Sequence, residues 1–492
     1  MSDCCNSGTC DTPSSTASET ADKTPAADKL HIAIIGTGSG AFAAAIKAAE
    51  LGARVSIIEG ADMIGGTCVN IGCVPSKIMI QGAETAWKQQ HFNYEGIQPQ
   101  TAVIDRRAML AQQQRWVDEL RYAKYESILE SSPDINLIRG WARFSDAQTL
   151  LIKKHDGSEE TLRADRYLLA VGARAAIPDI NGLRDTPYWT STEALVADDI
   201  PEHLVVLGGS VVALELAQAF LHLGARVTLM ARSTLLSKED DDLGAGLKPL
   251  LEDEGMEIML HTVPHRIQHD GKQFSISTKD GDVNCDRLLV ATGRQSNADG
   301  LALENAGVKT TKAGNIIIDS LMQTNVENIY AAGDCSNLPQ YVYVAAAAGS
   351  RAARNMLGEK IRLDLSTMPA VVFTNPQVAS VGLSRLQAAT QGLEVESRTL
   401  PLENVPRAIA NMDTRGFIKL VAEKHSGRLL GCQVLADSAG EIIQTAALAI
   451  HNRMTVEQLA EQLFPYLTMV EGLKLAAQTF SKDISQLSCC AA

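Results

Sequence analysis

The sequence lacks long hydrophobic runs, and it lacks an excess of positive charge. No apolar stretch approaches the ~20 residues needed to span a bilayer, which argues against a transmembrane segment. The formal net charge of -14 at pH 7 disfavours binding to nucleic acid or to anionic lipid. The first residues show neither the basic flank nor the apolar segment of a secretory signal, so we expect a cytoplasmic protein. Small molecules or ions are therefore the expected partners.

Cysteine is too sparse for a disulfide scaffold, because only ten occur among 492 residues and a reducing compartment would keep them as thiols. A chain of this length is expected to form roughly two to four domains. Three cysteines stand alone and are predicted to be small buried core residues: Cys285, Cys335 and Cys432. The other seven form three clusters, which are Cys4, Cys5 and Cys10, then Cys68 and Cys73, then Cys489 and Cys490.

A tail of low hydrophobicity precedes the first apolar run. Residues 11–28 are small, polar and proline-containing, so they cannot bury enough apolar surface to offset the entropy lost on ordering. We predict that residues 1–29 form a disordered tail and tether. Two hypotheses stand for its three cysteines: they collect a metal ion, or they belong to an inert tail.

A dinucleotide-binding unit is predicted to begin at residue 31. The apolar run 31–35 predicts a strand, and a glycine-rich turn then leads into an alanine-rich segment that predicts a helix. A second strand-like run follows and ends on an acid about 20 residues past the turn, which could accept a hydrogen bond from a ribose 2′-hydroxyl of FAD or NAD. The candidate cofactor-binding residues of this unit are Gly36, Gly38, Ala41 and Glu59.

The same pattern recurs 172 positions later, since 208 minus 36 is 172. The segment Leu-Gly-Ala-Arg-Val at 51–55 reappears at 223–227, which is the same offset. A repeat of strand, turn and helix in both copies indicates two homologous nucleotide modules. In the second copy, Gly208 and Ser210 occupy the glycine turn.

The second module differs from the first where a ribose would bind. Ala231 stands in place of the acid, and the cations Arg232 and Lys238 follow it. Losing a carboxylate and gaining two cations suits a 2′-phosphate, so this module is predicted to bind NADPH. The alternative is that both cations are ordinary solvated surface charges.

The segment 66–77, Gly-Thr-Cys-Val-Asn-Ile-Gly-Cys-Val-Pro-Ser-Lys, carries the strongest chemical signal. Cys68 and Cys73 lie five residues apart, and they can meet if the segment curls into the start of a helix. Helix amide dipoles there would favour the thiolate form. A zinc site needs about four ligands, and no second Cys or His pair lies nearby in the sequence. The pair is therefore predicted to serve redox chemistry or a soft metal.

These motifs, together with Ala-Thr-Gly-Arg at 291–294 and Ile-Tyr-Ala-Ala-Gly-Asp at 329–334, resemble the pyridine nucleotide-disulfide oxidoreductases over residues 30 to about 480. The resemblance implies an α/β fold with two Rossmann-like FAD/NAD(P)-binding modules and a C-terminal α+β dimerisation domain. It implies an FAD-binding domain at 30–182 and 286–365, an NADPH-binding domain at 183–285, and a dimerisation domain with a Cys-Cys tail at 366–492.

The same resemblance assigns roles to individual residues. Cys73 would contact the flavin, and Cys68 would face the substrate. Lys77 would lie near the flavin and pair with Glu215. Asp334 would bind the ribityl chain, and the C-terminal segment would complete the active site of a partner subunit in a homodimer. Gly66 and Thr67 are further cofactor-binding candidates.

The chain departs from the disulfide reductases of this family at residues 464–471. Alignment on Glu471 places Tyr466 where those enzymes carry an acid/base histidine, and a phenol is a poor proton shuttle at neutral pH. Cys489 and Cys490 near the terminus form a further thiol pair. Both features resemble the mercuric reductases, which implies Hg(II) as substrate and small thiols that deliver it. In that family the tail pair passes the metal inward and a further tyrosine assists, a position that Tyr188 would fill.

Two rival functions remain open at this stage. A thioredoxin reductase type of disulfide reductase also carries a C-terminal cysteine pair, but it needs the missing histidine. A protein that only sequesters metal could use the same cysteines, but it would not need two nucleotide sites. Two other patterns are not expected to form functional sites. His261, His265 and His269 have the spacing of metal ligands on a helix, but a proline interrupts them. The acids 239–242 are predicted to be a solvated face or a helix start.

Overall fold

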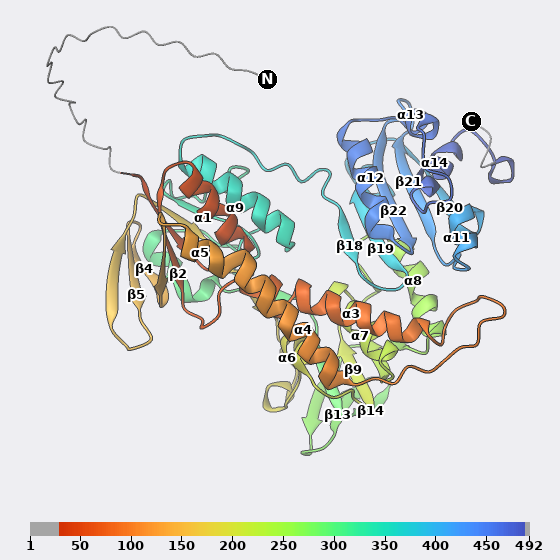
Figure 1. Cartoon of the computed structure of the whole chain (residues 1–492), viewed down its shortest axis with the longest axis horizontal. Helices are drawn as coiled ribbons and strands as arrows, with labels where there is room; N and C mark the ends of the chain where they lie inside the picture. Colours follow the sequence, from red (N-terminus) through yellow and green to blue (C-terminus); the bar gives the residue numbers. More distant parts are fainter. Residues whose placement is uncertain (1–28, 488–492) are drawn as a thin grey trace, which may run out of the picture.

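The computed structural model describes residues 29–487 (Figure 1). The predictions for the N-terminal cysteines and tether, and for Cys489 and Cys490, lie outside the described residues. Two parallel sheets and one antiparallel five-stranded sheet form the centres of three regions. This arrangement confirms the predicted α/β class with two nucleotide modules and a mixed C-terminal region. Within residues 29–487, no helix combines the length and apolar character needed to cross a bilayer.

The first module is built on a parallel sheet in the order β17-β7-β1-β2-β3. Its strands are β1 (His31–Ile35), β2 (Arg54–Glu59), β3 (Ile135–Arg139), β7 (Arg166–Leu169) and β17 (Ile329–Ala331). All five residues of β1 are buried, as expected for a central strand covered on both faces. Helices α1 (Ser39–Glu50) and α9 (Val342–Met356) pack against each other beside the sheet, and an antiparallel sheet of β4 (Trp141–Asp146), β5 (Thr149–Lys153) and β6 (Glu159–Arg163) adjoins it.

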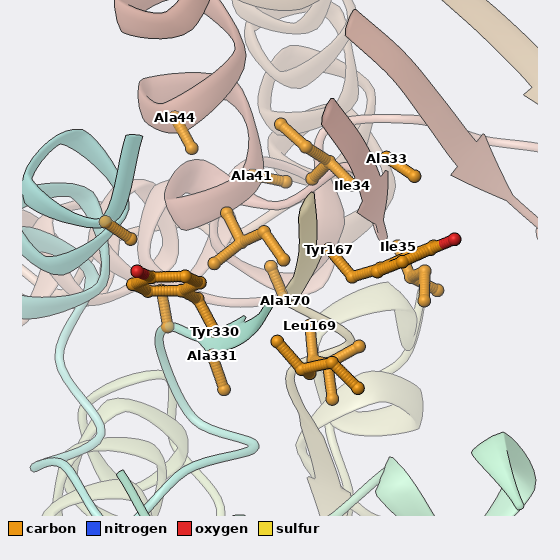
Figure 2. Packing of buried hydrophobic residues seen from close by; sticks show 14 of the residues in the cluster. Ala33, Ile34, Ile35, Ala41, Ala44, Tyr167, Leu169, Ala170, Tyr330 and Ala331 are labelled. Atoms are coloured by element: carbon orange, nitrogen blue, oxygen red, sulfur yellow. The ribbon is translucent and has the colours of Figure 1, made fainter. Parts of the chain in front are cut away.

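Segments far apart in the sequence make up the core of this module. Figure 2 shows Ile34 of β1 and Tyr330 of β17 on the same side of the sheet as Ala41 and Ala44 of α1, whereas Tyr167 of β7 lies on the other side with Ala33. The small Ala41 and Ala44 allow α1 to lie close to the strands, and both are fully buried. The strand that carries Tyr330 thus returns to the first module after the chain has passed through the second.

The second module repeats this architecture. Its parallel sheet, in the order β11-β10-β9-β15, contains β9 (His203–Leu207), β10 (Arg226–Met230), β11 (Glu257–Met259) and β15 (Arg287–Val290). Helices α7 (Val211–His222) and α8 (Asp241–Asp253) follow β9 and β10, and an antiparallel sheet of β12 (Arg266–His269), β13 (Phe274–Thr278) and β14 (Gly281–Cys285) extends the module.

The duplication extends to the register of the strands. Residue His31 pairs with Arg54 in the first module, and His203 pairs with Arg226 in the second, so both pairs span the same number of residues. The two buried histidines even bind equivalent hydroxyls, Ser56 at 2.9 Å and Thr228 at 2.8 Å. The repeat predicted from the glycine turns is therefore a repeat of packing as well.

The C-terminal region is an antiparallel sheet in the order β18-β19-β22-β21-β20. The strands are β18 (Ala370–Val372), β19 (Gln377–Gly382), β20 (Val395–Pro401), β21 (Phe417–Glu423) and β22 (Leu429–Ala436). Helix α12 (Ala439–His451) packs on β19 and β22, while α14 (Glu471–Gln478) packs on β20 and β21. Short helices α10 (Arg385–Thr390), α11 (Pro406–Ala410) and α13 (Val456–Glu461) complete it.

A group of helices between β2 and β3 connects the modules. These are α2 (Gly66–Ile71), α3 (Cys73–Lys88), α4 (Arg106–Arg121), the π-helical turn η1 (Tyr122–Glu126) and α5 (Ser127–Ser131). Helix α3 packs against α4 and against α7 of the second module, as Figure 1 shows. The short helix α6 (Ser191–Val196) lies at the same junction.

The isolated cysteines are buried core residues, and the three histidines do not share a helix. Cys285, Cys335 and Cys432 are buried, as predicted, and burial raises the pKa of each thiol. His269 ends strand β12, so the series of three histidines does not form one face of a helix. Among residues 29–487 no group of three His, Cys, Asp or Glu side chains is placed to hold a metal ion.

Candidate active site at the start of helix α3

The cysteine pair lies where helix α2 ends and helix α3 begins. Cys68 is in α2, Gly72 separates the helices, and Cys73 is the first residue of the 16-residue helix α3. Both cysteines are free thiols, with Cys68 half-buried and Cys73 exposed. The predicted curl of the segment into a helix start is therefore present, and the exposed amides of that turn favour negative charge on Cys73.

The two thiols differ in acidity. A hydrogen bond from Cys68 is the largest influence on the pKa of Cys73. Although the residue is exposed, neighbouring atoms partly desolvate its sulfur, which acts against that hydrogen bond. The Lys77 ammonium acts with the hydrogen bond, and the pKa of Cys73 falls to about 7. The pKa of Cys68 is raised, first by its hydrogen bond to Cys73 and then by burial. Since the thiolate is the nucleophile and the metal ligand, Cys73 is the sulfur that is charged near neutral pH.

This difference predicts a pH profile for alkylation of Cys73. Because its pKa is lowered, the thiolate is abundant above pH 7 and is lost as the pH falls through about 7. We expect the iodoacetamide rate, followed by mass spectrometry of the peptide that contains Cys73, to rise with a midpoint near that pH. In Cys68→Ala the midpoint moves upward, because the hydrogen bond is lost. Adding Lys77→Met moves it further, and an unchanged midpoint in both variants would contradict this account.

Lys77 lies one helical turn after Cys73 and forms an ion pair across the module boundary. Its Nζ is 2.6 Å from Oε2 of Glu215 on α7, whose side chain is only 5% exposed. The other carboxylate oxygen of Glu215 accepts a hydrogen bond from the Phe373 backbone amide at 2.9 Å. Lys77 also lies 4.6 Å from the centre of the Phe373 ring. Three regions of the chain thus hold the lysine beside the thiols.

The first glycine turn forms a cradle that a side chain would fill. A Cβ on Gly36, which has φ +105°, would lie 2.4 Å from the carbonyl oxygen of Ala170. A Cβ on Gly66 would lie 2.6 Å from the Cα of Gly38, so the turn and the start of α2 meet backbone to backbone. This leaves amides at the start of α1 open to a pyrophosphate. The residues fit an FAD phosphate group.

Two carboxylates mark the ends of this cradle. Glu59, at the end of β2, accepts a hydrogen bond of 2.5 Å from the Thr37 hydroxyl, which fixes the carboxylate beside the glycine turn. Asp334 follows β17 and pairs with Arg294 at 2.5 Å. Burial raises the pKa of Asp334, and the Arg294 guanidinium acts against that rise. Ala41 is buried in α1, and Thr67 lies in the first turn of α2.

The second glycine turn has the same form. A Cβ on Gly208, which has φ +137°, would lie 2.3 Å from the carbonyl oxygen of Ala291, and Ser210 is the N-cap of α7. Arg232 and Lys238 are both exposed in the segment after β10. No ion pair within residues 29–487 involves either cation. A dinucleotide with a phosphate on its adenosine ribose fits this donor set.

The remaining predicted residues, Tyr188, Tyr466 and Glu471, lie on segments other than α2 and α3. Tyr188 is half-buried against the core of the second module. Tyr466 is exposed in the loop before α14. The Glu471 carboxylate accepts a hydrogen bond of 3.1 Å from the Leu467 amide, where φ is +59°. Glu471 therefore fixes the loop that presents Tyr466.

Tyr125 is a residue beside the thiols that the sequence reasoning missed. It lies in the π-helical turn η1, and its hydroxyl is 3.2 Å from the hydroxyl of Ser39 at the start of α1. Burial raises the pKa of its phenol, the Ser39 hydroxyl lowers it, and negative charge on Cys68 and Cys73 raises it. A π turn is common at functional sites, but nothing in the sequence marks one here.

Comparison with known proteins agrees with this geometry. The family model of the pyridine nucleotide-disulphide oxidoreductases matches residues 30–349, and the model of their dimerisation domain matches residues 368–477. Among solved structures, a Cu(II) complex of the HOCl-induced flavoprotein disulfide reductase RclA from Escherichia coli is 29% identical. It has a TM-score of 0.84 and covers 93% of this chain and 100% of its own.

Curated relatives are more similar in sequence. A mercuric reductase from Shewanella putrefaciens is 57% identical over 96% of this chain and 85% of its own length. Mercuric reductases from Shigella flexneri and Acidithiobacillus ferrooxidans are 58% and 57% identical, over 96% of this chain and 84% and 87% of their own lengths. With two nucleotide cradles, a thiol pair and a dimerisation domain in place, the chain belongs to the pyridine nucleotide-disulphide oxidoreductase family.

Proposed function

We propose that this protein reduces Hg(II) to Hg(0) with electrons from NADPH that pass through FAD. The observation that carries the proposal is the free thiol pair at the start of α3, in a chain 57% and 58% identical to curated mercuric reductases. The reaction balances as NADPH plus Hg(II) giving NADP⁺, Hg(0) and one proton. Bound FAD supplies the two-electron relay between the nicotinamide and the metal.

The thiols bind the metal and set its charge. Cys73 enters as a thiolate because its pKa is lowered to about 7, whereas Cys68 releases its proton when the metal binds. Thiolates are the preferred ligands of a soft cation, and two of them neutralise Hg(II). The Lys77 ammonium, held by Glu215, keeps positive charge next to Cys73. Release of Hg(0) leaves both sulfurs ready for another ion.

The cofactors would be held by residues of the two cradles. Gly36, Gly38, Ala41, Glu59, Gly66, Thr67, Lys77 and Asp334 would hold FAD, and Gly208, Ser210, Arg232 and Lys238 would hold NADPH. The contact of α3 with α7 supports this assignment, because it brings the thiol helix to the second module. Domain limits of 30–182 with 286–365, 183–285 and 366–492 are part of the proposal.

The exposed position of Tyr466 supports a site shared between two subunits. The chain carries the family's dimerisation domain at residues 368–477, and the loop held by Glu471 presents a phenol on its surface. We place this phenol, and the Cys489 and Cys490 pair, at the thiols of the other subunit of a homodimer. Small thiols would deliver Hg(II) to the tail pair, and Tyr188 would assist as a further hydroxyl. We place the protein in the cytoplasm, because the proposed reaction needs a supply of NADPH.

A comparison of electron acceptors tests the function. The purified protein should oxidise NADPH with Hg(II) in the presence of excess small thiol, and it should release volatile mercury. Oxidised thioredoxin, glutathione and lipoamide should support no more than about 1% of that rate, because Tyr466 replaces the acid/base group that disulfide exchange needs. NADPH consumption with the disulfides alone would overturn the proposal. Consumption with none of the acceptors would indicate a protein that sequesters metal.

A further inference from the structure

A buried lysine of the C-terminal sheet binds the acidic end of the loop that carries Lys238. The side chain of Lys419, on β21, is only 8% exposed. Its Nζ lies 2.8 and 2.9 Å from the two carboxylate oxygens of Asp240 and 2.7 Å from Oδ2 of Asp242. On β19 of the same sheet, separated from β21 by β22, the Ser380 hydroxyl donates to Glu239 at 2.8 Å. The acids thus dock on a different region of the chain.

The loop between β10 and α8 is fixed on its other side by the second module. The Leu236 amide donates to the carbonyl of Gly209, in the glycine turn, at 2.8 Å. A Cβ on Gly244 would lie 2.2 Å from the carbonyl oxygen of Leu235, so the loop also lies directly on α8. Asp240 is the N-cap of that helix, which confirms a helix start at the acidic run. Lys238 is held between these two anchored segments.

The acidic run poses an electrostatic problem for a phosphate ligand. Lys238 is followed directly by four acids at 239–242, whose carboxylates would repel a phosphate bound beside Lys238. Lys419 offsets part of this charge from the side opposite to solvent. Burial lowers the pKa of Lys419, but its contacts with Asp240 and Asp242 outweigh burial and raise it overall, so the ammonium stays charged.

We infer that Lys419 is a positioning residue for the nucleotide 2′-phosphate: it neutralises and docks the acidic segment so that Lys238 can face the phosphate. The inference rests on the proposed NADPH site at Arg232 and Lys238. According to this inference, the C-terminal sheet contributes to the preference for NADP⁺ over NAD⁺. A lysine that only fastened two regions together would affect NADP⁺ and NAD⁺ binding equally.

Calorimetric titration of the purified full-length protein with NADP⁺ and NAD⁺ tests the inference. Lys419→Met should weaken NADP⁺ binding about fivefold, because one buried positive charge is lost near the phosphate, and should leave NAD⁺ binding within about twofold. Lys419→Arg should restore most of the preference. Lys248→Met is the matched control, since it removes one ammonium from α8 at an exposed pair with Glu252. It should leave both dissociation constants unchanged.

Two further variants separate the possible outcomes. Arg232→Ala should lower NADP⁺ affinity selectively; if it does not, the proposed phosphate site is wrong. If Arg232→Ala does lower NADP⁺ affinity selectively, but Lys419→Met changes the affinities for NADP⁺ and NAD⁺ equally or changes neither, only the inference about Lys419 is overturned. If Lys419→Met does not fold, Asp242→Asn is the variant that tests the inference. The Asp242 side chain is 58% exposed, and in this variant Lys419 retains its ion pair with Asp240. Asp242→Asn should strengthen NADP⁺ binding about twofold in low salt, and unchanged or weaker binding would overturn the inference.

Discussion

Replacing either cysteine of the pair with serine should reduce Hg(II)-dependent NADPH oxidation at least about 100-fold, because two sulfurs must hold the metal together. Serine keeps the shape of the side chain but offers a hard oxygen that is protonated at neutral pH, which a soft cation binds weakly. Cys68→Ser and Cys73→Ser should therefore both lose Hg(II)-dependent NADPH oxidation, although only Cys73 has a lowered pKa. The measurement is steady-state NADPH consumption with Hg(II) and excess thiol.

Two controls show whether such a loss is specific to the pair. Cys432→Ala removes a thiol that is fully buried in β22, and it should keep turnover within about twofold of the unchanged protein. The two serine variants should still bind FAD and should still pass electrons from NADPH to it, since neither cradle is altered. A variant that retained rapid mercury release with one sulfur replaced would refute the two-thiol mechanism.

The sequence predicted those parts of the site that lie close together in the chain. The glycine turns, the strand ends and the cysteine segment are each short patterns whose geometry is local, so their spacing carries the information. The offset between the two modules predicted a repeated unit, and the structure extends that repeat to the strand register, as the pairs His31 with Arg54 and His203 with Arg226 show. The contact of Lys77 with Glu215 came only from resemblance, because 138 positions separate the two residues.

Long-range contacts and irregular backbone explain what was missed. Tyr125 comes close to the thiols through a π turn, whose hydrogen-bond pattern has no clear sequence signal. Lys419 lies in the apolar run 417–422 of β21, and its acidic partners are 177 and 179 positions away. Tyr188, placed by resemblance, lies half-buried against the core of the second module, and its role stays a prediction.

Gly349→Ala should strongly lower the stability of the protein, because it places a methyl group where two helix backbones touch. A Cβ on Gly349, in α9, would lie 2.0 Å from the carbonyl oxygen of Gly40 in α1. The obstacle is backbone rather than a flexible side chain, so α1 and α9 must separate. Overpacking of this kind costs about 3 kcal/mol. We expect the melting temperature to fall by roughly 5–10 °C.

The same substitution should also loosen FAD, because α1 begins at the glycine turn that would hold the pyrophosphate. Displacing α1 moves the amides after Gly38 away from the sheet, and the cradle shared with Gly66 opens. The flavin content of purified Gly349→Ala, measured by absorbance, should therefore fall with the melting temperature. Gly300→Ala is the matched control, since a methyl group there meets open space. Normal flavin content in both variants would mean that the spacing of α1 and α9 does not determine the geometry of the cradle.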